Sequence, residues 1–89
     1  MTEPLLTRIT SNPAIFGGKP IIRGHRFAVQ HLLDYLAAGM TEAELLADFP
    51  FLEPDDIKAA LLYAGRLAGM TRMSGASVGA AFEHAEAAD

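Results

Sequence analysis

The residues best suited to bind another molecule form a basic group near the start of the sequence. Lys19, Arg23 and Arg26 occur within one stretch of eight residues. Arginine donates paired hydrogen bonds to guanine or to phosphate, and short basic arms enter the grooves of DNA. Arg8 precedes this group and His25 lies inside it. We therefore predict that the segment contacts DNA through Arg8, Lys19, Arg23, His25 and Arg26.

Charge is unevenly divided along the 89 residues, whose net charge is −4 at pH 7. Residues 1–30 carry four cations and one carboxylate, whereas residues 31–89 carry three cations and ten carboxylates. This division indicates two surfaces with different partners, and the acidic total argues against indiscriminate nucleic-acid binding. Two other interpretations of the basic segment stay open. It is a solvated loop, or its arginines pair with the acidic helices of the same chain.

The sequence offers no residue set with the spacing of a catalytic or metal-binding site. The glycines and lysine at 17–19 suggest a phosphate loop, but Pro13 and Pro20 stand where that motif needs Gly and Ser or Thr. The chain has no Cys, which removes disulfides, thiolate ligands and a Cys nucleophile. The three histidines lack the four-residue spacing of helical zinc pairs. We predict a protein that is not an enzyme, with no catalytic residues, no metal and no cofactor.

A short, mostly helical fold must position these residues. A chain of 89 residues, 51% of them hydrophobic, makes one compact domain. The segment 8–28 is interrupted by Gly and Pro and predicts a β arm. Within it, residues 20–28 predict a tight hairpin or hooked arm in which Gly24 takes a positive φ. Residues 1–7 are predicted to be a flexible N-terminus.

Three helices are predicted behind the arm. Apolar residues recur at three-and-four spacing over about 29–38, which is the pattern of one helix face. Thr41 and Glu44 form a capping box. This box opens a second helix over 42–49, and Pro50 ends it.

The third helix, over about 54–68, has apolar residues on two sides. Its first turn carries acidic residues, which the helix dipole favours at that end. The stripe expected to face the core consists of Ile57, Ala60, Leu61, Ala64 and Ala68. The second apolar surface consists of Leu62, Tyr63 and Leu67. Because a helix that is apolar on two sides needs a second partner, we predict that this surface forms a homodimer or partner interface.

The second and third helices have the order and the short turn of a helix-turn-helix motif. Such motifs present the start of their second helix to the bases. Here Asp55 and Asp56 stand where phosphates would lie, so we expect any DNA contact to come from the arm. The predicted fold is mainly α: a three-helix, helix-turn-helix or homeodomain-like bundle which, with the β arm, fills residues 8–69. Residues 70–89 predict a weakly helical tail.

Several segments resemble one known family in order and spacing. They are GGKPIIRGHRFAV at 17–29, LAAGMT at 36–41, DFP at 48–50 and DIKAALLYA at 56–64. Together they resemble the signature of domain-of-unknown-function family 433 over residues 8–66. The resemblance implies a homeodomain-like or winged-helix-like bundle behind a β arm. It also implies an antitoxin of a bacterial type II toxin–antitoxin pair.

Such an antitoxin would neutralise a PIN-like ribonuclease toxin and bind operator DNA to repress its own operon. The acidic part of the chain, 31–89, suits a basic or metal-charged toxin cleft, where carboxylates occupy the positions of substrate phosphates. The alternative is a protein-interaction or dimerisation module with no nucleic-acid role. The sequence shows no signal peptide and no apolar run that spans a bilayer, so we expect a cytoplasmic protein without a membrane partner.

Overall fold

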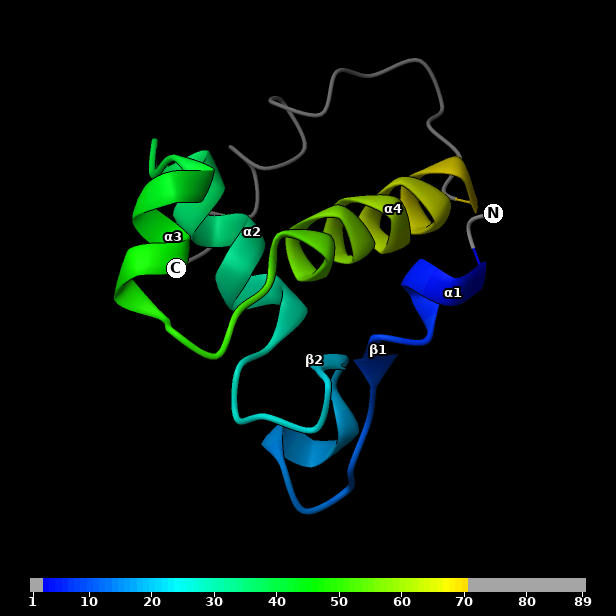
Figure 1. Ribbon diagram of the computed structural model, residues 1–89. Coiled ribbons are helices and arrows are strands. Elements are labelled where there is room, and N and C mark those ends of the chain that lie inside the picture. The colour runs from blue at the N-terminus through cyan, green and yellow to red at the C-terminus, as the bar shows by residue number, and fades with distance from the viewer. Residues whose placement is uncertain (1–2, 71–89) are drawn as a thin grey trace, which may run out of the picture.

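A mainly helical fold with a short β arm is confirmed by the computed structural model (Figure 1). The structure describes residues 3–70, so the tail predicted over 70–89 lies outside the described residues except for Met70. In chain order the elements are α1 (Glu3–Leu6), β1 (Ile9–Thr10), the 3₁₀ turn η1 (Phe16–Gly18), β2 (Ile21–Ile22), α2 (Val29–Ala37), α3 (Glu42–Asp48) and α4 (Pro54–Met70). Within residues 3–70, no helix is long and apolar enough to cross a membrane.

The described chain begins with α1, a single helical turn where the sequence predicts a flexible segment. Pro4 lies in this first turn, where a helix has no use for the missing N–H. The Thr7 hydroxyl donates to the Pro4 carbonyl over 2.6 Å and closes the turn. Leu5 and Leu6 are half-buried, and α1 packs beside α4. The segment is therefore held by a distant helix, which no local pattern reveals.

β2 is the central strand of the arm. β1 pairs with it antiparallel, with Ile9 opposite Ile22 and Thr10 opposite Ile21. On the other edge of β2, Ile21 bridges Ala28 at the entrance to α2. Ile21 and Ile22 are both fully buried, and Ile22 belongs to the core.

The chain reverses direction between β2 and Ala28 through a tight turn. The His25 N–H donates to the Ile22 carbonyl over 2.8 Å. Arg23 and Gly24, the two central residues, have φ of +42° and +75°. Positive φ at both central positions is typical of the type I′ turn, whose twist suits antiparallel strands. The predicted hairpin and the positive φ of Gly24 are confirmed.

Local capping sets the ends of α2 and α3. After α2, Gly39 has a φ of +104°, and the N–H groups of Gly39 and Met40 donate to carbonyls of the last turn, as in a Schellman motif. Before α3, the Thr41 hydroxyl accepts from the Glu44 N–H over 3.1 Å. The Glu44 carboxylate in turn accepts from the Thr41 N–H over 2.8 Å. The predicted capping box is confirmed, and α3 ends before Pro50.

The core lies where the arm meets α2, α3 and the first half of α4. Its buried members are Ile22, Phe27, Val29, Leu32, Leu45, Leu52, Ile57 and Ala60. Leu61, predicted on the core stripe, is instead 49% exposed. The reason is that Asp56 occupies a core position on α4, so the buried face of this helix begins one residue before the apolar pattern does.

The second half of α4 extends away from α2 and α3 toward α1 (Figure 1). Residues 61–70 hold seven hydrophobic residues and one charged residue, Arg66. All ten are nevertheless half-buried or exposed. Because helices in proteins are stabilised mainly by packing an apolar face, this half of α4 presents surface that suits a partner.

Candidate functional site

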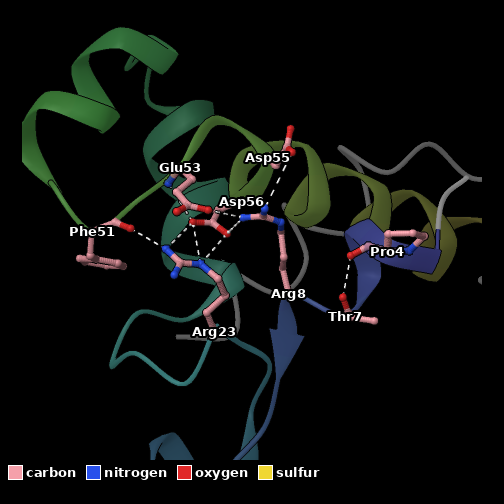
Figure 2. Close-up of polar contacts among 8 residues, drawn as sticks. All are labelled: Pro4, Thr7, Arg8, Arg23, Phe51, Glu53, Asp55 and Asp56. Carbon is pink, nitrogen blue, oxygen red and sulfur yellow. Dashed lines mark hydrogen bonds and ion pairs between the residues drawn. The ribbon is translucent and has the colours of Figure 1, made fainter.

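The carboxylate of Asp56 is the centre of a polar network at the start of α4 (Figure 2). Its side chain is fully buried, in the first turn of the helix. The carboxylate accepts a hydrogen bond from the Glu53 N–H over 2.8 Å. This contact is the backward half of a capping box, with Asp in the place of Glu or Gln. A buried carboxylate destabilises the folded protein unless a cation matches its charge, so the stability of this site depends on the cations around Asp56.

Two arginines from the arm match that charge. Arg23 reaches it from the turn after β2 and donates Nε to Oδ1 and Nη2 to Oδ2, each over 2.9 Å. Arg8, just before β1, donates Nη1 to Oδ1 over 2.9 Å. Arg23 also donates to the Phe51 carbonyl in the turn that precedes α4. Figure 2 shows both guanidiniums converging on Asp56 from the arm, so this network joins the arm to α4.

The network keeps Asp56 ionised. Burial on its own raises the pKa of this carboxyl, because the charged form loses its water. The hydrogen bonds from Arg23, from the Glu53 amide and from Arg8 favour the charged form and outweigh burial. The pKa of Asp56 therefore lies below its ordinary value.

The structure places Arg8 and Arg23 in ion pairs within the chain, and contact of either with DNA stays a prediction. The sequence predicts that both contact DNA, but each pairs with a carboxylate of its own chain. Arg8 additionally lies 2.7 Å from Glu53 and 3.8 Å from Asp55. The interpretation in which the arginines pair with the acidic helices is confirmed for these two residues. Sequence could not choose it, because Asp56 is 48 residues from Arg8 and 33 from Arg23.

The other predicted DNA contacts are placed differently. Lys19 and Arg26 are exposed, and in the described part of the chain neither makes an ion pair. His25 is half-buried and stacks on Phe51, with 4.4 Å between ring centroids and 29° between planes. The arm thus keeps two solvated cations and one stacked imidazole, whose contact with DNA stays a prediction.

Seven aromatic rings form a continuous cluster that the sequence analysis does not predict. They are Phe16, His25, Phe27, His31, Tyr35, Phe49 and Phe51, and we call their surface the aromatic face. Phe27 is its buried centre, 4.7 Å from Phe49 and 5.6 Å from Phe51 between centroids. Phe16 and Tyr35 lie at its rim and are 37% and 39% exposed. The spacing of His31 and Tyr35, one helical turn apart, is the local signal that could have indicated it.

An apolar groove of about 350 Å³ runs between α2 and α4. Val29 and Leu33 line it from α2, and Tyr63, Ala64 and Leu67 line it from α4. Its charged lining residues are Lys19 and Asp34. Of the predicted interface residues, the structure therefore brings Tyr63 and Leu67 to one groove, whereas Leu62 is half-buried elsewhere on α4.

Among residues 3–70, no three His, Asp or Glu side chains come together in an arrangement that could hold a metal ion.

Most of the arm and of the three-helix bundle lies within the match to a recognised family. The family described as "Protein of unknown function (DUF433)" matches residues 9–64, and this chain is a member of it. A crystal structure of a DUF433 member protein from Anabaena variabilis ATCC 29413 resembles the chain with a TM-score of 0.67 and 32% sequence identity. That similarity covers 76% of this chain and 67% of the other.

A curated relative is the uncharacterized protein y4eO of Sinorhizobium fredii (strain NBRC 101917 / NGR234). It is 38% identical over 56 residues, which are 63% of this chain. The matched part is 25% of the relative, so the chain spans about a quarter of that protein's length.

Proposed function

We propose that this chain is a non-catalytic, antitoxin-type binding protein that holds a PIN-like ribonuclease on its aromatic face. The observation that carries the proposal is the exposed rim of that face. Tyr35 and Phe16 leave more than a third of their surface in water, although Tyr35 stacks on the buried Phe27 and Phe16 contacts the ring of His31. Protein interfaces are enriched in aromatic side chains, and a few rings of this kind supply most of the binding energy.

The carboxylates of α3 favour a basic partner. Asp48 directly precedes Phe49, and Glu42 begins the same helix, α3. Both carboxylates are exposed, and within residues 3–70 neither forms an ion pair. A ribonuclease needs a cationic surface to hold RNA phosphates, and these carboxylates would compete for it.

The test is binding and inhibition of a PIN-like ribonuclease encoded beside this chain. Calorimetry should give a complex, and the complex should not cleave RNA. Tyr35→Ala should weaken binding by about thirtyfold, the loss of an interface ring worth about 2 kcal/mol. Leu61→Ala, on exposed α4 surface outside the aromatic face, is the matched control and should bind normally. Unchanged affinity of the Tyr35 variant would remove the aromatic face from the proposal.

A second candidate function, operator binding, is favoured by the solvated cations of the arm. Among the predicted DNA contacts, Lys19 and Arg26 are the exposed cations that no ion pair joins to another side chain of residues 3–70. A gel-shift titration on the DNA upstream of the coding region should show binding that weakens with salt. Replacing Lys19 and Arg26 together by Ala should lower the salt slope by about 2, because two phosphate contacts are lost. Absence of a shift at low salt leaves the protein-interaction module without a nucleic-acid role.

A further inference from the structure

The groove between α2 and α4 has the features of an interface with a second copy of this chain. We propose that two copies pair about a two-fold axis, each laying the side of α4 that carries Tyr63 and Leu67 along the groove of the other. The interface is separate from the aromatic face, so the inference does not depend on the ribonuclease proposed above.

Shape is the first argument. Most of the side chains that line the groove are apolar. The same chain supplies a matching convex element, since the side of α4 that carries Tyr63, Ala64 and Leu67 is apolar and remains half-buried or exposed. Leu67 belongs to both, because it lines the groove and is 49% exposed. In a two-fold dimer the same patch serves on both subunits, as such an interface requires.

Charge is the second argument. Lys19 contributes a cation to the groove from the arm, and Asp34 contributes an anion from α2. Both are exposed, and no ion pair joins either to another side chain among residues 3–70. A two-fold axis through the groove sets Lys19 of each copy against Asp34 of the other, which gives two ion pairs. An unrelated partner would have to supply this charge pattern, whereas a second copy carries it by symmetry.

Position is the third argument. Val29 and Leu33 line the groove from one side of α2. His31 and Tyr35 lie on nearly the opposite side of that helix, since each residue adds a rotation of about 100°. Pairing through the groove therefore leaves both aromatic faces of the dimer open to another protein.

The test is the oligomeric state of the full chain, measured by light scattering and sedimentation equilibrium. We expect a dimer. Leu67→Glu should shift it to monomer, because a carboxylate would be buried in the groove. Leu61→Glu is the matched control: Leu61 has the same exposure of 49% on the same helix but does not line the groove, so this variant should remain a dimer. Circular dichroism of both variants establishes that they fold.

A charge exchange gives a second readout that does not depend on apolar contact. Lys19→Asp and Asp34→Lys should each weaken the dimer by about tenfold, since like charges then face each other across the axis. The double variant restores opposite charges and should return to within about threefold of the wild-type dissociation constant.

Three results overturn the proposal. They are a full chain that stays monomeric at millimolar concentration, a Leu61→Glu variant as disruptive as Leu67→Glu, and a double charge variant that is not rescued. A monomer whose groove is protected from hydrogen exchange would mean that the chain covers its own groove. A groove that becomes protected only when the ribonuclease is added would assign it to that partner. Each of these last two outcomes also excludes the second copy.

Discussion

Replacing Asp56 by Asn tests how much the polar network at the start of α4 contributes to the fold. The substitution keeps the shape and one acceptor oxygen but removes the negative charge. It also turns an amide NH₂ group toward cationic donors. Arg8 and Arg23 then lose the charge that both approach within 2.9 Å, in a site where the Asp56 side chain is fully buried.

The expected loss of stability follows from the burial of the partners. Breaking one side of a buried ion pair costs about 3–5 kcal/mol. The side chains of Arg8 and Arg23 are 26% and 30% exposed, so both guanidiniums regain some water. We therefore expect the lower end, about 3 kcal/mol. For a domain of this size that change lowers Tm by about 10–25 °C. It is a large share of the roughly 5–15 kcal/mol by which small domains are stable.

Urea unfolding followed by circular dichroism measures this difference. Asp55→Asn is the matched control, because that carboxylate is 52% exposed in its side chain and lies 3.8 Å from Arg8. It should change the free energy of unfolding by less than about 0.5 kcal/mol. If Asp56→Asn were as stable as the control, the network would contribute nothing to the stability of the fold, and the reasoning above would be refuted.

Three further predictions concern stability. Hydrogen bonds hold the pKa of Asp56 below its unfolded value of about 3.9. The stability that ionised Asp56 contributes is therefore complete above that pH and is lost as the pH falls through the folded pKa. Urea titrations should show a loss of stability below about pH 4, and Asp56→Asn should reduce that loss. Gly24→Ala should lower the free energy of unfolding by about 1 kcal/mol, because the φ of this residue is +75°. No atom lies within 4 Å of an added Cβ, so backbone strain acts alone. An unchanged midpoint of urea unfolding would contradict the turn geometry. Thr41→Ala should cost about 1 kcal/mol through the lost cap of α3, and Thr41→Ser should restore most of it.

Features set by neighbouring residues could be predicted from the sequence. The capping box of Thr41 and Glu44 lies within four residues, and Gly24 marks a turn whose geometry few other residues tolerate. The helices of the bundle follow from apolar spacing for the same reason. Each of these signals depends on interactions that the local chain completes by itself.

Features set by distant residues could not be predicted. The sequence shows Asp56 as one acid in the first turn of a helix, where a solvated carboxylate is the ordinary expectation. Its burial depends on two arginines that only the folded arm brings to it. The aromatic face has the same origin, because Phe27 meets Phe49 and Phe51 across more than twenty residues of chain. The exposure of Leu61 has the same origin. Asp56 takes a core position, so the buried face of α4 is displaced by one residue from the face that the apolar residues predict.

The link between Arg23 and Asp56 also bears on the order in which the protein is completed during synthesis. Arg23 holds a φ of +42°, which is unfavourable for a residue with a side chain. The contacts that compensate come from Phe51 and Asp56, and the ribosome adds them about thirty residues later. A nascent chain that ends after α2 therefore has the strained turn without its counter-charge. Although the arm is synthesised first, the carboxylate that pairs with Arg23 is added only with the start of α4.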